Sequence, residues 1–186
     1  MDGMEARKRY TYTDYASWND ENRCELIDGV AYMLSPAPGL VHQEILGVMH
    51  ARLFNFLQGK PCKVFVSPFD VRLNAAGDND DTVVQPDLVV ICDKSKLDDK
   101  GCNGAPDMII EILSPSTASR DRVLKFNKYL QAAVREYWIV DPESNSISVF
   151  ILENGKYIAS VYMEKDNIPV HVLEGCVINL TEVFAR

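Results

Sequence analysis

The segment that most constrains this chain is Pro106–Thr117, which reads PDMIIEILSPST. Its apolar run, Met108–Leu113, carries one acidic residue, Glu111, in the middle. Apolar residues at successive positions predict a strand that is covered on both faces, in a central position of a sheet. A carboxylate buried there costs several kcal/mol unless a cation or hydrogen-bond donors meet it. We therefore expect Glu111 to have a partner, either in a functional site or as a salt-bridged core glutamate.

Length and composition indicate one globular domain, at residues 11–186, preceded by a basic, loosely held leader at residues 1–10. The chain has 186 residues, of which 47% are hydrophobic and 25% are charged, so it can bury a sizeable core. Its formal net charge is −8, which excludes a general basic field that would attract nucleic acid. Any contact with phosphates would need a local basic patch or metal ions.

The cysteines predict reduced thiols in a cytoplasmic protein. There are five, an odd number without a CxxC pair, which argues against both a disulfide framework and a zinc site. The N-terminal stretch lacks the apolar core of a signal peptide, and no run approaches the length of a membrane span. We expect no membrane partner. The five are Cys24, Cys62, Cys92, Cys102 and Cys176.

The N-terminal half alternates between helical and strand patterns. Thr13 is a predicted helix cap with Asp14 in the first turn, and Asp28-Gly29 is a two-residue hairpin turn. The apolar face of Ile45, Met49, Leu53 and Phe56 predicts the clearest long helix. The expected elements are a helix over 13–22, a hairpin over 25–34, a helix over 42–58, and strands over 63–66, 69–73 and 87–91, with loops at 74–81 and 93–105.

The C-terminal half places a helix between two buried strands and ends in an antiparallel meander. A helix capped by Ser119 would present Val123, Phe126, Leu130 and Ala133 as its apolar stripe. The expected elements are the central strand, a helix over 119–133, strands over 136–140, 147–152, 156–163 and 176–178, and a helical turn over 181–184. The fold class is α/β, with a mixed sheet flanked by helices.

Two acidic residues, Asp87 and Glu111, each lie in an apolar strand and are expected to converge. Neighbouring strands are about 5 Å apart, so two such carboxylates can approach each other across one strand spacing. Asp107 shares the face of Glu111 but lies four residues earlier, roughly 13 Å away at about 3.3 Å per residue. Asp107 is therefore expected to mark only the start of its strand.

Convergent carboxylates with few histidines favour a hard cation, Mg²⁺ or Mn²⁺, over zinc. No histidine forms an HExxH pair, and His42 and His50 are expected at the surface or edge of the long helix. The chain also lacks the GxSxG turn of Ser-His-Asp hydrolases and the glycine-rich phosphate loops GxxxxGK and GxGxxG. A site, if present, consists of carboxylates and metal.

Several motifs together resemble the Uma-two family, whose members are described as endonucleases. Pro86-Asp87 followed by Glu111-Ile112-Leu113 resembles the PD-(D/E)xK signature of restriction-endonuclease-like nucleases. The wider pattern comprises CELIDG at 24–29, HQ at 42–43, QPDLVV at 85–90 and IIEILSPST at 109–117, then Asp121, Lys125 and Tyr129, and EYWIVDP at 136–142. The resemblance covers about residues 12–157.

The resemblance implies a restriction-endonuclease-like core in which Asp87 and Glu111 bind Mg²⁺ or Mn²⁺ and Glu25 joins them. His42, Gln43 and Asp121 are possible secondary site residues. The chain departs from the motif at position 113, where Leu113 stands in place of the lysine. The resemblance suggests a migrated lysine, with Lys125 supplying the amine from the following helix.

Structural alternatives stay open for each of these residues. Lys125 could form only an exposed i,i+4 pair with Asp121, because it lies about 120° from the predicted apolar stripe at about 100° per residue. Glu25 could pair with Arg23 or with a neighbour across the hairpin. Tyr129 and Tyr137 are expected at the edge of the core rather than in catalysis.

Three functions remain compatible with the sequence. The first is a metal-dependent endonuclease acting on DNA, with a homodimer expected by analogy with nucleases that cut both strands. The second is a catalytically silent binding or assembly domain of nuclease fold. The third is a hydrolase of small phosphoesters. The basic cluster Arg120, Arg122, Lys125 and Lys128 favours the first, although it could also be a solvated helix face.

Overall fold

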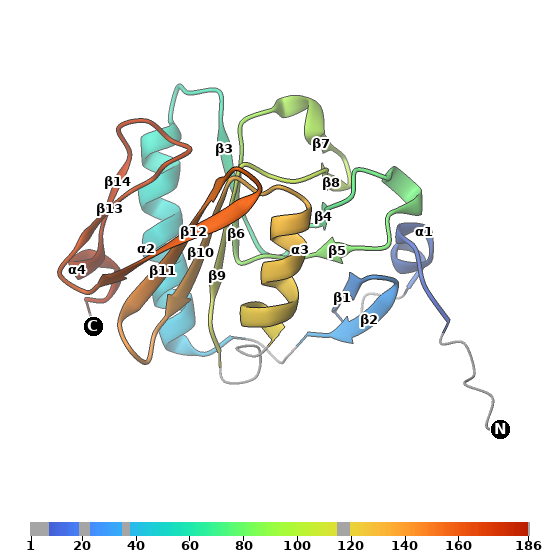
Figure 1. Cartoon of the computed structure of the whole chain (residues 1–186), viewed down its shortest axis with the longest axis horizontal. Helices are drawn as coiled ribbons and strands as arrows, with labels where there is room; N and C mark the ends of the chain where they lie inside the picture. Colours follow the sequence, from blue (N-terminus) through green and yellow to red (C-terminus); the bar gives the residue numbers. More distant parts are fainter. Residues whose placement is uncertain (1–7, 19–22, 35–37, 115–119, 186) are drawn as a thin grey trace.

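The computed structural model of the protein describes residues 8–18, 23–34, 38–114 and 120–185, without the side chains of residues 120–122. Two six-stranded sheets and the helices beside them form a mixed α/β fold, as predicted (Figure 1). Most of the expected leader lies outside the described residues. Within its last part, the amide of Tyr10 already donates to the carbonyl of Gly29 at 2.9 Å.

The larger sheet has the strand order β12-β11-β10-β9-β6-β3. β9 lies in its middle, as the apolar run predicts, and pairs in parallel with β10 and antiparallel with β6. The remaining pairs are antiparallel, and β11 and β12 form the predicted meander. The strands are β3 (Lys63–Val66), β6 (Leu88–Ile91), β9 (Met108–Ile112), β10 (Glu136–Asp141), β11 (Ser146–Glu153) and β12 (Lys156–Met163).

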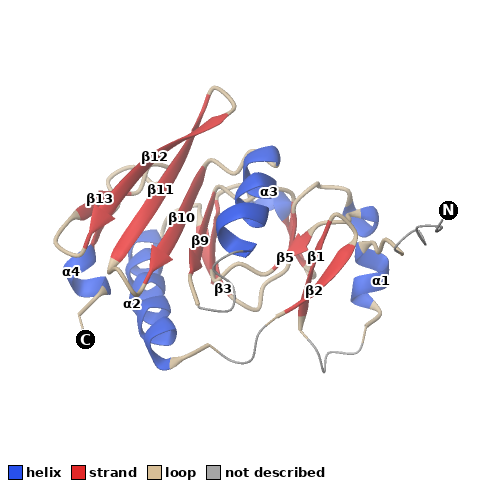
Figure 2. Ribbon diagram, turned by 60° about the horizontal axis from the view of Figure 1, so that its bottom comes forward, coloured by secondary structure: helices blue, strands red, loops and turns tan. Residues whose placement is uncertain are grey.

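Both faces of β9 are buried because a helix lies on each side of the sheet (Figures 1 and 2). On one side, Met108, Ile110 and Ile112 join the buried cluster of helix α2 (Leu40–Leu57). On the other, Ile109 and Leu113 join the cluster that contains Tyr129 of helix α3 (Phe126–Gln131). Glu111 shares the parity of Ile109 and Leu113 and therefore lies on the α3 side.

The second sheet has the order β2-β1-β5-β4-β8-β7 and stands at the N-terminal end of the molecule (Figure 2). Its strands are β1 (Cys24–Ile27), β2 (Val30–Met33), β4 (Val71–Arg72), β5 (Val83–Val84), β7 (Leu97–Asp98) and β8 (Gly101–Asn103). The prediction of a plain loop over 93–105 was therefore wrong. The smaller elements are α1 (Tyr12–Ala16), the 3-10 turns η1 (Gly77–Asn79) and η2 (Lys94–Lys96), β13 (Asn167–Pro169), β14 (Val177–Asn179) and α4 (Leu180–Val183).

The predicted hairpin turn is confirmed residue for residue. β1 ends at Ile27, Asp28 and Gly29 form the turn, and β2 begins at Val30. Asp28 and Gly29 have φ values of 50° and 73°, the left-handed pair that a two-residue turn requires. A Cβ on Gly29 would also lie 2.8 Å from Cβ of Arg9, so glycine is needed here for space as well.

The first helix is shorter than predicted and is capped by a different residue. It spans Tyr12–Ala16, and Thr11, not Thr13, is its cap. The amide of Thr11 donates to Oδ2 of Asp14 at 2.9 Å, which completes a capping box. Residues 19–22, where the prediction continued the helix, lie outside the described residues.

The buried face predicted for the helix after β9 is only partly right, because Phe126 packs against the apolar cluster but Val123 does not. It begins with π-helical turns, η3 (Arg120–Lys125), and continues as α3. Val123, assigned to the apolar stripe, is 62% exposed, whereas Lys125 and Tyr129 are buried. A π-helix has more residues per turn than the α-helix assumed for the stripe, so it rotates every later side chain relative to that pattern.

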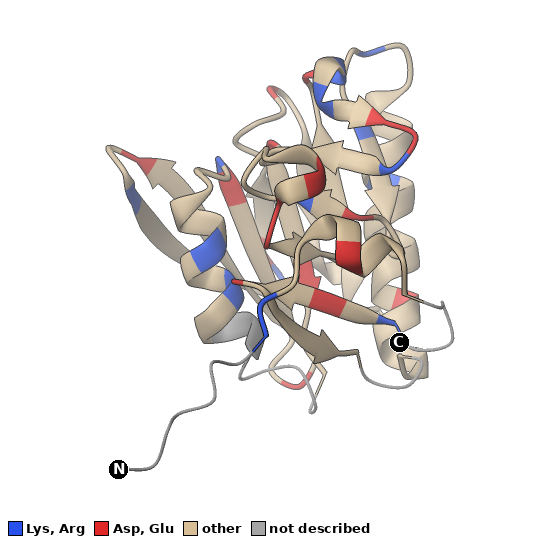
Figure 3. Cartoon of the chain, turned by 90° about the vertical axis from the view of Figure 1, so that its right-hand side faces the viewer, with Lys and Arg blue, Asp and Glu red and all other residues tan. Residues whose placement is uncertain are grey.

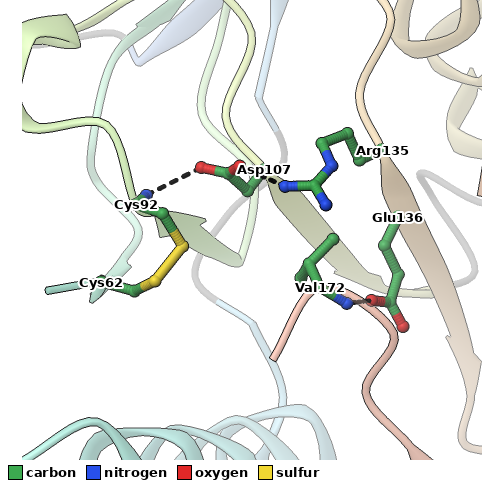
Figure 4. Close-up of a disulfide and its surroundings, with 6 residues drawn as sticks. All are labelled: Cys62, Cys92, Asp107, Arg135, Glu136 and Val172. Atoms are coloured by element: carbon green, nitrogen blue, oxygen red, sulfur yellow. Dashed lines mark hydrogen bonds and ion pairs between the residues drawn. A yellow bond between two sulfur atoms is a disulfide. The ribbon is translucent and has the colours of Figure 1, made fainter. Parts of the chain in front are cut away.

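The prediction that all five cysteines are reduced was also wrong, because Cys62 and Cys92 form a disulfide (Figure 4). Cys62 precedes β3 and Cys92 follows β6, at the end where Lys63 pairs with Ile91. The amide of Cys92 donates to Asp107 at 2.7 Å. Cysteine number and spacing do not reveal which strands pair, so the sequence alone could not show this partnership. Cys24, Cys102 and Cys176 are free and buried.

Among the described residues, no helix combines the length and the apolar character needed to cross a membrane.

Candidate functional site

Three charged side chains that lie far apart in the sequence meet on the α3 side of the central sheet. Nζ of Lys125 lies 2.8 Å from Oε1 of Glu25 and 2.9 Å from Oε1 of Glu111. All three residues are buried: Lys125 is 4% exposed, Glu25 0% and Glu111 3%. The exposed-pair alternative for Lys125 therefore does not hold, and neither does the pairing of Glu25 with Arg23. We call Glu25, Glu111 and Lys125 the acid–lysine cluster.

The fold explains why these residues meet. Glu111 lies on β9, in register with Ile139 of the parallel strand β10. Parallel neighbours need a crossover, and here the crossover is the helix that carries Lys125 back over the sheet face. Glu25 enters from β1 of the second sheet, which stands beside the same helix (Figure 2). The cluster thus joins the two sheets and the crossover helix.

Tyr129 is a member of this site that the sequence interpretation assigned to the edge of the core. Its hydroxyl donates to Oε1 of Glu111 at 2.6 Å, and the residue is fully buried. Burial first, and then the negative charge of Glu111, raise the pKa of Tyr129 well above its usual value. The phenol therefore stays protonated and can donate. Its spacing from Lys125, four residues on a helix, is the sequence signal that could have revealed it.

The second oxygen of Glu25 has no hydrogen-bond partner among the described residues although it is buried. Its first oxygen, Oε1, accepts both Lys125 and the amide of Gln85, the latter at 2.9 Å. With both acids ionised, the acid–lysine cluster carries one net negative charge inside the protein. Buried carboxylates are costly without positive partners, so this arrangement is suited to a further cation.

Asp87 meets β9 one residue after Glu111, where β6 and β9 separate. Its Oδ2 accepts the amide of Ile112 at 2.7 Å, beyond the last paired residues, Leu88 and Ile110. The same oxygen lies 3.2 Å from Nε2 of His42 on α2. His42 is only 8% exposed, so the prediction that it faces the surface was wrong: the first turn of α2 packs against the end of the sheet.

The other candidates take different positions. Gln43 is exposed on α2, next to His42. Leu113, in the motif lysine position, is buried in the apolar cluster and has no polar atom to offer the site. Lys128 pairs with Asp28 at 2.6 Å and not with the cluster. The side chains of Asp121, Arg120 and Arg122 lie outside the described residues.

Asp107 behaves as expected for a residue at the start of its strand. It precedes β9, accepts the amide of Cys92 and pairs with Arg135 at 3.0 Å (Figure 4). It makes no contact with the acid–lysine cluster in the described part of the chain.

The chemistry of the site fits a hard divalent cation. Asp87, Glu111 and Glu25 offer carboxylate oxygens, which Mg²⁺ and Mn²⁺ prefer, and the partnerless oxygen of Glu25 is an acceptor that a cation could satisfy. The described residues contain no ready-made group of three or more His, Cys, Asp or Glu that could hold a metal ion. The ammonium of Lys125 instead supplies positive charge to Glu25 and Glu111.

Comparisons with known proteins give a relative in sequence and a neighbour in structure. The chain is 26% identical over 160 residues to an uncharacterized protein, slr1290, of the cyanobacterium Synechocystis. The aligned region covers 83% of this chain and 81% of that protein. A crystal structure from Anabaena variabilis, titled "putative nuclease belonging to DUF820", superposes with a TM-score of 0.75 over 95% of this chain and 98% of that chain. At 18% identity, this likeness shows the shared fold alone.

A protein-family model also matches most of the chain. The model of the Uma2 family, described as "Putative restriction endonuclease", matches residues 11–181 and so includes every residue of the acid–lysine cluster, together with Asp87. The resemblance inferred from the sequence motifs is thereby confirmed, and this chain belongs to the Uma2 family.

Proposed function

We propose that this protein is a metal-dependent endonuclease that hydrolyses phosphodiester bonds of DNA. Membership of the Uma2 family supports a nuclease. The observation that carries the proposal is the position of Lys125, whose ammonium meets Glu111 from the crossover helix. The strand position two residues after Glu111 holds Leu113, so a lysine from another element takes up the role of the motif lysine.

Asp87 and Glu111 would hold Mg²⁺ or Mn²⁺, with Glu25 beside them. When bound, such an ion acidifies a water molecule and polarises a phosphoryl oxygen. The side chains around it have separate tasks. Lys125 supplies a fixed positive charge that offsets charge developing on the phosphate oxygens. Tyr129 and Lys125 both bind Oε1 of Glu111, which fixes the orientation of that carboxylate.

A catalytically silent nuclease-fold domain is the second candidate, and Leu113 is the observation that favours it. Loss of the motif lysine would end catalysis if Lys125 served only to neutralise Glu25 and Glu111. Hydrolysis of a small phosphoester is a further alternative. Both differ from the proposal in one measurable respect, because neither predicts cleavage of DNA.

The test is cleavage of supercoiled plasmid by the purified protein. We expect nicked or linear product with Mg²⁺ or Mn²⁺ and none with EDTA. Glu111→Gln should abolish the product, whereas the control Glu182→Gln should cleave normally, because Glu182 pairs with Arg52 on another part of the surface. Cleavage by Glu111→Gln, or in EDTA, would contradict the proposal.

We further propose that the protein acts as a homodimer, since two sites are needed to cut both strands in one encounter. A dimer should convert supercoiled plasmid to linear product with little nicked intermediate, and sedimentation should give twice the mass of one chain. A monomer that accumulates nicked circles would overturn this part of the proposal.

A further inference from the structure

Arg23 is an exposed cation that the protein holds in a fixed position. It lies two residues before Glu25, directly ahead of β1. Its Nη2 donates to Oγ of Ser67 and to Oε1 of Gln85, both at 2.8 Å, and its Nε donates to the same Gln85 oxygen at 3.3 Å. Neutral acceptors therefore orient the guanidinium without cancelling its charge.

The orientation of Gln85 is itself determined by a partly buried network. Its Nε2 donates to the hydroxyl of Tyr15 at 3.0 Å and to Oδ1 of Asp70 at 2.8 Å. Tyr15 also donates to Oδ1 of Asp70, at 3.0 Å. With both amide hydrogens directed at these groups, the amide oxygen of Gln85 must face Arg23.

Gln85 and Ser67, the two residues that accept hydrogen bonds from Arg23, also bond to residues of the candidate site. The backbone amide of Gln85 donates to Oε1 of Glu25 at 2.9 Å. The backbone amide of Ser67 donates to the carbonyl of Asp87 at 3.1 Å. Gln85 thus links the guanidinium to Glu25, and Ser67 links it to the backbone of Asp87. Both acids belong to the proposed site.

Arg23 also differs in charge environment from comparable surface residues. The exposed residues Arg52 and Arg135 each pair with a carboxylate. Arg23 makes no ion pair with any carboxylate in the described ranges of the chain. Figure 3 shows Lys and Arg interspersed with Asp and Glu along the ribbons of the side that faces the viewer. Asp70, on the other side of the Gln85 amide, is close enough to interact with its charge. In a chain of net charge −8, an oriented arginine with no carboxylate in direct contact is well suited to receive an anion.

We propose that Arg23 binds a backbone phosphate of the nucleic acid and so positions the strand against the acid–lysine cluster. A guanidinium can bind two phosphate oxygens at once, and contacts to the backbone fix position without reading base sequence. This inference rests on the proposed nuclease function and names a substrate-positioning residue for it. It also explains how an acidic protein could hold DNA without a broad basic surface.

The test measures DNA binding separately from cleavage. Anisotropy of fluorescein-labelled duplexes of two unrelated sequences is followed in EDTA over a series of NaCl concentrations, for wild type, Arg23→Ala, Arg23→Lys and the control Arg52→Ala. Arg52→Ala removes the same charge from an exposed arginine of α2. Thermal melting of each variant verifies that it is folded.

We expect Arg23→Ala to weaken binding of both duplexes by about tenfold, the size of one charge-assisted hydrogen bond. The slope of log K against log salt should fall by about 0.9, as for one lost phosphate contact. Arg23→Lys should retain that slope, because it keeps the charge, and Arg52→Ala should match wild type in both quantities.

Three outcomes would overturn the inference, and they have different consequences for the proposed function. If Arg23→Ala keeps the wild-type salt slope while the wild type cleaves plasmid, the inference fails and the nuclease proposal stands. If wild type neither binds nor cleaves DNA, both fail together. An equal loss in Arg52→Ala would also contradict the inference, because the effect would then be one of net charge.

Discussion

Nζ of Lys125 lies 2.9 Å from Oε1 of Glu111, 14 positions away in the sequence, and both side chains are buried. The contact places a cation from the crossover helix against the one acidic residue of the central strand. Lys125 thus supplies positive charge to Glu111, the carboxylate that lies within the apolar run of β9. It also links the stability of the protein to its proposed chemistry.

Removal of the Lys125 ammonium should destabilise the protein strongly. Lys125→Ala leaves Glu25 and Glu111 buried and facing each other, so we expect the free energy of unfolding to fall by about 3–5 kcal/mol. Urea denaturation in EDTA measures this loss. The matched control is Lys128→Ala, whose pair with half-exposed Asp28 should contribute at most about 1 kcal/mol. Equal, small losses in both variants would mean that Lys125 behaves as a surface residue.

Divalent ions should stabilise the folded protein through the same acids. A ligand that binds only the folded state adds about 2.7 kcal/mol at a concentration of about 100 Kd. For a chain of this size, this corresponds to a rise in Tm of roughly 5–10 °C. Differential scanning calorimetry with Mn²⁺ should show the rise in wild type and not in Asp87→Asn. An equal rise in Asp87→Asn would place ion binding elsewhere.

Tyr129 should contribute to stability through its bond to Glu111. Tyr129→Phe removes only the hydroxyl, and a hydrogen bond to a charged group contributes about 1.5–3 kcal/mol. We expect a loss in that range at neutral pH, measured by urea denaturation. A loss close to zero would show that the bond to Glu111 is not maintained in solution.

The alkaline limb of the stability curve should depend on the same residue. The pKa of Tyr129 is raised in the folded state, so above about pH 10 the unfolded chain loses the phenolic proton first. Stability should therefore fall as pH rises through this range, and less steeply in Tyr129→Phe, by up to about 1.4 kcal/mol per pH unit. Parallel slopes for the two proteins would contradict the raised pKa.

The disulfide predicts a specific thiol count. Alkylation of the denatured, unreduced protein should add three labels, on Cys24, Cys102 and Cys176, and reduction should increase the number to five. Intact mass spectrometry distinguishes the two. Because the bond closes a loop of 30 residues, its reduction should also cost roughly 3–4 kcal/mol of stability. Five labels without reduction would restore the prediction of free thiols.

Local features of the chain were readable from the sequence because they depend on residues close together. The Asp28-Gly29 turn requires left-handed backbone angles that these residue types tolerate, and the hairpin followed without error. The spacing of apolar residues in α2 likewise predicted its buried face, and the unbroken apolar run of β9 predicted burial on both faces. Several short motifs, from CELIDG at 24–29 to EYWIVDP at 136–142, were together enough to indicate the family.

Only the tertiary structure showed which groups that are distant in the sequence meet, and which of them are buried or disulfide-bonded. The partnership of Cys62 with Cys92 depends on strand register, and the burial of His42 depends on how α2 meets the end of the sheet. The contact of Lys125 with Glu25 and Glu111 depends on π-helical turns that rotate the helix away from its apparent apolar stripe. A sequence pattern records local periodicity, whereas the pairing of buried charges is set by low-dielectric packing between elements far apart in the chain.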